Sequence, residues 1–251
     1  MFSLENKNIV ITGASSGIGK QCAINCSKMG ASLVLFDWNK EGLEHTLSQL
    51  VGNTYLFFIQ DVREIDQLDS AINKVVTELG VIDGFIHSAG IQNTLPLRLH
   101  NKGIYYDQLD VNAIGGFEAC RILTKMNYFN PNGGSLVFIA SIRGLFGAAN
   151  QVGYAASKGA VIAGVKSMAM ELAIRKIRVN SISPGMVEDT EMTRDILAQL
   201  PPQWSKESQL EYPLGWVTTN DIANACIFLL SDESKRITGT NIIVDGGFSA
   251  K

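Results

Sequence analysis

The sequence predicts an α/β fold in which one parallel sheet is covered by helices on both faces. Short apolar runs of strand length alternate along the chain with segments whose apolar residues recur at helical spacing. The runs are continuously apolar, which is typical of strands buried on both faces. The chain has 251 residues, 46% of them hydrophobic, which is enough for the core of one large domain. No linker or internal repeat divides it, so we expect a single domain over 1–251.

About seven segments have the character of strands, beginning with NIVIT at 8–12. The others are 31–37, 55–61, 81–90, 134–141, 177–185 and 240–247. Helices are expected between them over 17–30, 40–50, 63–80, 102–127 and 153–174. The first of these helices places Ile18, Cys22 and Cys26 on one stripe and is expected to stop at Gly30.

One stretch, residues 185–217, breaks the alternation of strands and helices. It is rich in residues that interrupt regular structure or fill a pocket: Pro201, Pro202, Trp204, Pro213 and Trp216. We expect a loop with short helices here, long enough to act as a lid over a substrate.

Charge and hydropathy exclude several classes of function. The net charge of −3 provides no basic field to attract nucleic acid. The opening MFSLENKN lacks the apolar core of a signal peptide, and no apolar run reaches the roughly 18–20 residues of a membrane span. Cys22, Cys26, Cys120 and Cys226 have no partners at metal-site spacing. We therefore expect reduced thiols, no metal site and a cytoplasmic protein that binds neither nucleic acid nor membrane.

The segment TGASSGIG at 12–19 lies between the first expected strand and the first expected helix. Glycines at such a turn let the backbone approach a pyrophosphate, and the helix N-terminus supplies free N–H groups. Asp37 ends the second strand, where a carboxylate accepts hydrogen bonds from both ribose hydroxyls and repels a 2′-phosphate. No cation follows at Trp38. The sequence thus predicts a Rossmann-type doubly wound sheet that binds NAD in preference to NADP.

Tyr154 and Lys158 in GYAASKG stand four positions apart, about one helical turn, and so share a helix face. Moving a phenol from its usual pKa of ~10 to ~7 requires about 4 kcal/mol. A cation within about 4–6 Å typically lowers such a pKa by 1–3 units. We therefore expect Lys158, helped by an oxidised nicotinamide, to lower the pKa of Tyr154 and make it a base near operating pH.

The glycine spacing of 12–19, followed by Ser141, Tyr154 and Lys158, resembles the short-chain dehydrogenase/reductase family. The resemblance covers essentially the whole chain, down to ITGTNIIVDGG near its end. It implies an oxidoreductase in which Tyr154 is the catalytic acid/base and Lys158 holds the nicotinamide ribose. It further implies that Ser141 polarises the substrate carbonyl and that Asn112, in DVNAIG, holds a water of the proton relay.

The same resemblance implies the residues that bind the cofactor. The segment SPGMV is expected to close on the nicotinamide, with the Val187 backbone meeting its carboxamide, and Asp61 and Val62 are expected to flank the adenine. The full implied set is Gly13, Ser15, Ser16, Gly17, Ile18, Gly19, Asp37, Trp38, Asp61, Val62, Ser88, Ala89, Gly90, Tyr154, Lys158, Pro184, Gly185, Val187 and Thr190.

Two positions depart from the family pattern. The sequence HSAG stands where the family has Asn-Asn-Ala-Gly, and we interpret His87 as a structural replacement while Ser88 keeps small polar contacts near the ribose. The threonine expected after SPG is replaced by Asp189, with Thr190 one step later. Because a carboxylate beside a diphosphate is unfavourable, Thr190 is favoured as the contact with a one-residue shift.

The substrate is expected to be covered by the residues that follow the fourth strand, by 142–151 and by the lid. These segments offer Gln92, Leu95, Arg98, Arg143, Leu145, Phe146, Asn150, Met186, Met192, Trp204 and Trp216. The mixture favours a moderately apolar secondary alcohol or ketone with a polar end. An arginine near such a pocket either binds an anion or caps a loop.

Two other functions are compatible with the motifs. A 3-oxoacyl-carrier-protein reductase would prefer NADP(H) and would present a basic surface, for which Arg175, Lys176 and Arg178 form only a modest cluster. A non-catalytic nucleotide-sensing protein would have a broken catalytic set. The family resemblance also implies a homotetramer, or a dimer, assembled through the helices 102–127 and 153–174.

Overall fold

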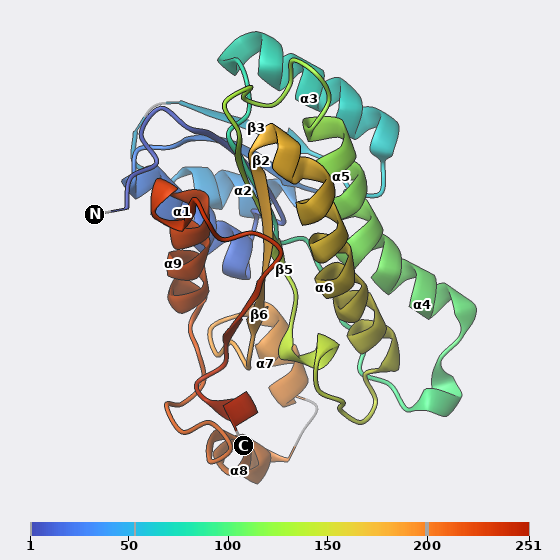
Figure 1. The fold of residues 1–251 in the computed structure, drawn as a ribbon. Helices are drawn as coiled ribbons and strands as arrows, with labels where there is room; N and C mark the ends of the chain where they lie inside the picture. The colour runs from blue at the N-terminus through green and yellow to red at the C-terminus, as the bar shows by residue number, and fades with distance from the viewer. Residues whose placement is uncertain (1, 53, 199–200, 251) are drawn as a thin grey trace.

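The computed structural model describes residues 2–52, 54–198 and 201–250. Within them, seven strands form one parallel sheet in the order β3-β2-β1-β4-β5-β6-β7, with helices on both faces (Figure 1). The strands are β1 Asn8–Thr12, β2 Ser32–Asp37, β3 Tyr55–Ile59, β4 Gly84–His87, β5 Gly134–Ile139, β6 Ile177–Pro184 and β7 Asn241–Val244. The predicted doubly wound sheet is confirmed.

The helices between the strands are α1 Gly17–Lys28, α2 Lys40–Leu47, α3 Ile65–Leu79, α4 Lys102–Leu109, α5 Gly115–Leu123 and α6 Val152–Leu172. They match the expected helices except at 102–127. There a π-helical turn, Asp110–Ile114, separates α4 from α5, and the helix ends at Leu123. Such a wide turn has no signature in hydrophobic spacing, and it recurs at functional positions in helices.

The C-terminal third contains α7 Glu191–Ala198, α8 Pro202–Gln209 and α9 Thr219–Leu230. The first two lie in the expected lid segment, of which residues 199–200 and the Trp204 side chain lie outside the described part of the chain. The sequence reading did not predict α9. Its start carries a capping box, in which Thr218 and Asp221 bond each other's main-chain N–H.

The strands are buried on both faces because their side chains alternate between two cores. Val10 of β1 belongs to the core under α3, α5 and α6, while its neighbours Ile9 and Ile11 belong to the core under α1 and α9. Figure 1 shows the two helical layers on opposite sides of the sheet. This alternation explains why β1 is continuously apolar.

The cysteines belong to these cores. Cys22, Cys26 and Cys226 are buried between α1 and α9, Cys120 is buried on α5, and all four are free thiols, as predicted. Within the described residues no helix is long and apolar enough to cross a membrane, and no group of three acidic, histidine or cysteine side chains is placed to hold a metal ion.

The topology fixes where a site can form. β1 pairs with β2 on one side and with β4 on the other, so the winding direction reverses between β1 and β4. In open α/β sheets, ligands bind beyond the carboxyl ends of the strands at such a reversal. The segments TGASSGIG and HSAG follow β1 and β4 at this point.

Candidate active site

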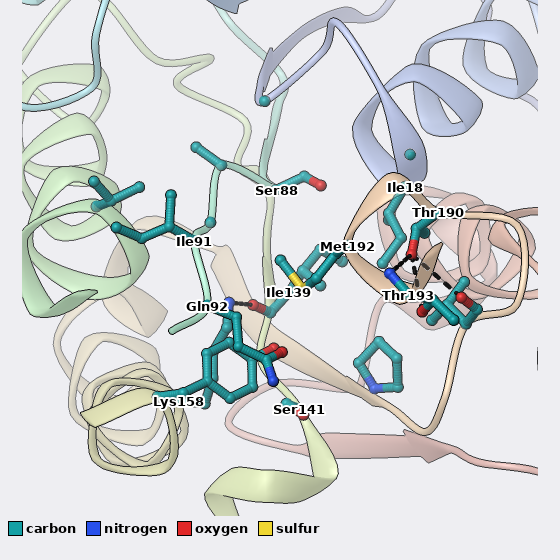
Figure 2. A pocket seen from close by; sticks show the side chains of 18 of the residues that line it. Ile18, Ser88, Ile91, Gln92, Ile139, Ser141, Lys158, Thr190, Met192 and Thr193 are labelled. Atoms are coloured by element: carbon teal, nitrogen blue, oxygen red, sulfur yellow. Dashed lines mark hydrogen bonds between the residues drawn. The ribbon is translucent and has the colours of Figure 1, made fainter. Parts of the chain in front are cut away.

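A cavity of about 740 Å³ opens at the carboxyl ends of the central strands. Its size is within the usual range for a small-molecule or cofactor site. Figure 2 shows Ser88, Ser141 and Lys158 on one side of this cavity and Thr190, Met192 and Thr193 across from them. The expected cofactor residues that line it are Gly13, Ser15, Ser16, Gly17, Ile18, Asp37, Trp38, Asp61, Val62, Ser88, Ala89, Gly90, Tyr154, Lys158, Pro184, Gly185, Val187 and Thr190.

The loop after β1 has the geometry of a phosphate cradle. Gly13 has a φ of +71°, and a Cβ there would lie 2.5 Å from the Ala89 backbone nitrogen. Gly19 does not line the cavity. A Cβ at Gly19 would collide with the Gly13 carbonyl oxygen, so this glycine lets α1 pack closely on the loop. Ser16, the N-cap of α1, makes no side-chain cap, so the first N–H groups of the helix are left for a ligand.

Asp37 lies at the end of β2 beside this loop. Its Oδ2 accepts a hydrogen bond from Ser15 N at 3.1 Å, and its Oδ1 accepts one from Asn39 N at 2.9 Å. These bonds fix a buried carboxylate at the cavity wall, in the position that the ribose interpretation requires. The indole of Trp38 next to it is 77% exposed and forms the outer rim.

A further polar pair, Asp61 and Arg63, lines the end of the cavity at which the adenosine is expected. Asp61 accepts hydrogen bonds from the Arg63 guanidinium, the shortest at 2.6 Å, and these bonds lower the pKa of the Asp61 carboxyl. Arg63 also lies 3.7 Å from Asp107. The sequence reading did not single out Arg63, although a cation two residues from Asp61 was a visible signal.

At the other end of the cavity, three predicted side chains meet. Ser141 follows β5, and its Oγ accepts a hydrogen bond from Arg143 N at 3.1 Å. Tyr154 and Lys158 lie on the same face of α6, as expected from their spacing, with Lys158 Nζ 5.8 Å from the centre of the Tyr154 ring. The Lys158 ammonium donates a hydrogen bond to the Ile139 carbonyl at 2.8 Å, which Figure 2 shows.

The electrostatics of Tyr154 differ from the expectation. Burial raises the pKa of its phenol above the usual value, while a hydrogen bond with Ser141 and the charge of Arg143 lower it by less. Lys158 is not among the groups that shift it, and burial lowers the pKa of Lys158 itself to about 8. In the protein without cofactor, Lys158 thus does not lower the pKa of this phenol, and the expectation that Lys158 and an oxidised nicotinamide together lower it stays a prediction. The desolvation of a buried phenol outweighs a cation that is bonded to a carbonyl.

Asn112 lies behind the cavity, in the π-helical turn. Its Oδ1 accepts from Ile91 N at 2.7 Å, and its Nδ2 donates to Ile91 O at 2.9 Å and to Ser157 Oγ at 2.8 Å. Ser157 Oγ in turn donates to Tyr154 O. Both N–H groups of the side-chain amide are thus used in tying the segment after β4 to α6, and a water held by this side chain would have to donate to the second lone pair of Oδ1.

His87 is completely buried between β1 and the π-helical turn. Thr12 Oγ1 donates to its Nδ1 at 2.9 Å, and its Nε2 donates to the Val111 carbonyl at 3.2 Å, an arrangement that places the ring proton on Nε2. Burial and the charge of Lys158 lower its pKa to about 3. A ring that is neutral at physiological pH and bonded on both sides has a structural place, in agreement with the interpretation from sequence.

Asp189 and Thr190 face different partners. The Asp189 carboxylate accepts hydrogen bonds from Thr219 N at 2.8 Å and Thr219 Oγ1 at 2.7 Å, so it holds the first turn of α9. Thr190 lines the cavity, and its methyl group would lie 3.5 Å from a Cβ at Gly17. Thr190 thus lies at the cavity while Asp189 bonds α9, and a contact between Thr190 and the cofactor stays a prediction.

The substrate end is formed by fewer of the expected residues than the sequence suggested. Those that line the cavity are Gln92, Arg143, Asn150, Met186 and Met192. Leu95, Arg98, Leu145, Phe146 and Trp216 are not among the described lining residues. Tyr212, from the end of the lid, does line it, and its ring lies 4.9 Å from that of Phe248, near the C-terminus.

Comparisons with known proteins agree with this geometry. A family model described as enoyl-(acyl carrier protein) reductase matches residues 13–249. The chain is 35% identical to a 3-oxoacyl-[acyl-carrier-protein] reductase of Thermotoga maritima, over 97% of this chain and 98% of that protein. It is 32% identical to the D-threitol dehydrogenase of Mycolicibacterium smegmatis, over 100% and 95%. Carveol dehydrogenase from Mycobacterium avium in complex with NAD superposes with a TM-score of 0.92 at 27% identity, covering both chains completely.

Proposed function

The chain belongs to the short-chain dehydrogenase/reductase family and is an NAD(P)-dependent oxidoreductase acting on CH–OH groups, and we propose that it exchanges a hydride between NAD(H) and a secondary alcohol or ketone. The observation that carries the proposal is the convergence of Ser141, Tyr154 and Lys158 on the same cavity that Asp37 and the α1 N-terminus line at its other end.

The cavity fits a nicotinamide dinucleotide. The glycine loop and the uncapped α1 N-terminus suit its diphosphate, and the Asp37 carboxylate suits the adenosine ribose. When bound, the cofactor supplies the hydride acceptor or donor. We propose that the full set of lining residues named above holds it, with the Lys158 ammonium bonded to the nicotinamide ribose.

The chain's own residues handle the proton. In the reductive direction, the neutral Tyr154 phenol would donate its Oη proton to the substrate oxygen, while the bound cofactor would supply the hydride to the carbonyl carbon. In the oxidative direction, Tyr154 would first lose its own proton, and the resulting phenolate would accept the proton of the substrate hydroxyl. Ser141 Oγ accepts a hydrogen bond from Arg143 N and its hydroxyl is hydrogen-bonded with Tyr154, so we propose that this hydroxyl turns to the substrate oxygen when the substrate is bound. Asn112 acts as a positioning residue, because its amide fixes Ile91 and, through Ser157, the first turn of α6.

The preference for NAD over NADP is supported by Asp37. Its carboxylate is buried at the cavity wall, and a 2′-phosphate beside it would bring two anions together. Arg63, a cation near this end, is already paired with Asp61 and with Asp107.

A second candidate is a 3-oxoacyl-carrier-protein reductase that uses NADP(H), and the names of several relatives favour it. The basic cluster 175–178 offers it little support. The Arg175 guanidinium bonds the Thr124 carbonyl, and Arg178 bonds Ser234 Oγ at 2.8 Å and Ser231 O at 3.1 Å. These two arginines are therefore engaged within the fold. A non-catalytic sensor is less well supported, because Ser141, Tyr154 and Lys158, the side chains expected to act on the substrate, are present and line one cavity.

The proposal is tested by an absorbance screen at the nicotinamide band, with NAD(H) and NADP(H) in parallel. The panel contains secondary alcohols, ketones and an acetoacetyl thioester. Turnover of alcohols or ketones with a higher kcat/KM for NAD(H) is the expected result. Turnover confined to the thioester with NADPH would replace the proposal with the second candidate, and binding of NADH without any turnover would favour the sensor.

Assembly and location are proposed as well. The helices expected to join subunits carry exposed apolar side chains, among them Tyr106 on α4 and Met170 on α6, which support a homotetramer or dimer. Light scattering on the purified protein tests this directly. The four free thiols support a reducing compartment such as the cytoplasm.

A further inference from the structure

The short turn after β5 holds one arginine in a fixed place. Arg143 lies in the 3₁₀ turn Ile142–Gly144, and its N–H donates to Ser141 Oγ. The next residue, Gly144, packs directly on α6, since a Cβ there would lie 2.8 Å from the Lys158 carbonyl carbon. The Arg143 side chain therefore starts from a turn that is locked to Ser141 on one side and to the helix of Tyr154 on the other.

The guanidinium of Arg143 lies at the substrate end of the cavity. Its central carbon is 5.5 Å from the centre of the Phe248 ring, and Phe248 packs against Tyr212. Its charge lowers the pKa of both Tyr154 and Tyr212, which places it within electrostatic reach of the reacting phenol. The group thus stands between the catalytic tyrosine and the wall formed by the lid and the C-terminal residues.

Within the described part of the chain, the Arg143 guanidinium has no acidic partner. No ion pair joins Arg143 to an aspartate or glutamate there, and its side chain donates no hydrogen bond to the described residues. Other arginines are engaged: Arg63 with Asp61, Arg121 with Glu118, and Arg178 with Ser234. The face of an aromatic ring attracts a guanidinium, but it accepts no hydrogen bond from the N–H groups that point outward in the plane of the guanidinium.

The charges of the cavity divide between its two ends. The carboxylates of Asp37 and Asp61 line the adenosine end together with Arg63, which is paired with Asp61. The charged side chains at the reacting end are the cations Lys158 and Arg143. Among the described residues of the lid, the carboxylate that lines the cavity is that of Glu191, which is exposed in the first turn of α7. An anionic group on the substrate is therefore favoured at the reacting end, and a guanidinium matches a carboxylate with two parallel N–H···O bonds.

We propose that Arg143 recognises an anionic group of the substrate, and that the substrate is a hydroxy acid or oxo acid whose carboxylate lies close to the reacting carbon. The inference rests on the proposed function and narrows its substrate class. The carboxylate is unchanged in the reaction: the carbinol carbon would lose a hydride to the oxidised nicotinamide, the hydroxyl proton would pass to the Tyr154 phenolate and make it a neutral phenol, and a ketone would form. A sulfonate or phosphate presents the same charge and hydrogen-bond acceptors, so it enters the test as a separate arm.

The test compares each acid with its neutral ester. Four-carbon 2-hydroxy and 3-hydroxy acids, the methyl ester of each and a hydroxyalkyl sulfonate are assayed with NAD and four proteins: wild type, Arg143→Gln, Arg143→Lys and Arg236→Gln. Arg236 is an exposed arginine outside the cavity lining and serves as the matched control. Wild type is expected to prefer at least one acid over its ester by about tenfold or more in kcat/KM.

Arg143→Gln is expected to lower kcat/KM for the acid by about 10- to 100-fold and for the ester by less than about threefold. Arg143→Lys is expected to have a kcat/KM for the acid between those of wild type and Arg143→Gln, and Arg236→Gln is expected to match wild type. Equal losses for acid and ester would show that Arg143 only holds the C-terminal wall, and would overturn the proposal. A wild-type preference for esters or other neutral alcohols would overturn it while leaving the proposed function intact. Preference for the sulfonate over the carboxylate would keep the anion site and exclude a carboxylate substrate.

A binding measurement separates this proposal from the proposed function. Titration of the oxo acid and its ester into Tyr154→Phe and into Arg143→Gln/Tyr154→Phe, each with NADH bound, reports the anion site without turnover. Binding of the acid that is lost with Arg143 supports the site even if no alcohol is oxidised. Equal binding of acid and ester to Tyr154→Phe overturns the site even if wild type oxidises neutral alcohols.

Discussion

The two ends of the cavity are built in different ways. At the dinucleotide end, main-chain geometry does most of the positioning: Gly13 admits the Ala89 backbone, and Ser15 N–H orients the Asp37 carboxylate. At the substrate end, long side chains from three distant segments meet, namely Arg143, Tyr212 and Phe248. A binding site formed by main-chain groups requires particular residues, such as glycine, at each close approach. A binding site formed by side chains can be built from many different residues, so its composition can change with the substrate.

The largest expected effect separates chemistry from cofactor binding. Tyr154→Phe removes the hydroxyl that exchanges the proton and leaves the dinucleotide end unchanged. We expect kcat to fall by about 10²- to 10⁴-fold while the Kd for NADH stays within about threefold. Stopped-flow or steady-state rates and fluorescence titration of NADH measure the two quantities. Near-normal turnover in this variant would remove Tyr154 from the mechanism.

The next change acts only at the dinucleotide end. Asp37→Ser removes the buried carboxylate and its repulsion of a 2′-phosphate. We expect the ratio of kcat/KM for NAD to that for NADP to fall by about 10- to 100-fold. Asp107→Asn is the comparison, since it removes a carboxylate near the same end while Arg63 keeps its bonds to Asp61. An unchanged ratio in Asp37→Ser would mean that another group selects the cofactor.

The pH dependence of NADH binding tests the proposed bond between Lys158, at the reacting end of the cavity, and the nicotinamide ribose. Burial lowers the pKa of Lys158 to about 8, so the ammonium is mostly charged at pH 7 and loses its proton as the pH rises through 8. If Lys158 holds the ribose, NADH binding should weaken by up to about tenfold between pH 7 and 9.5. Lys158→Met should bind NADH more weakly and with no such pH dependence. A flat profile in wild type would contradict this assignment.

The smallest effects distinguish two neighbouring residues. Asp189→Asn weakens the bonds to Thr219 and should lower the free energy of unfolding by about 1–3 kcal/mol, with no change in the KM for NAD. Thr190→Ala should raise that KM by a few fold, because Thr190 lines the cavity opposite Gly17. Thermal melts and cofactor kinetics on both variants check the division, and a reversed pattern would assign the cofactor contact to Asp189.

Predictions from the sequence were correct where the residues of one short segment are enough to fix its structure. Every expected strand is present, and the loop 12–19, Asp37 and the Tyr154–Lys158 pair lie where their spacing placed them. The signals failed where the outcome depends on packing between segments. The π-helical turn at 110–114 keeps an ordinary apolar pattern, and α9 was passed over although Thr218 and Asp221 form a readable capping box.

The sequence by itself determined the doubly wound sheet, and it singled out the glycine-rich loop 12–19 and the candidate reacting residues Ser141, Tyr154 and Lys158. Each of these depends on residue types at short, fixed separations along the chain. Only the tertiary structure decided the electrostatics of Tyr154, the direction of Asp189 toward α9, and the place of an arginine without an acid partner beside Phe248. These features depend on burial and on contacts between segments far apart in the chain. Desolvation and pairing are properties of a site in space, and local spacing does not encode them.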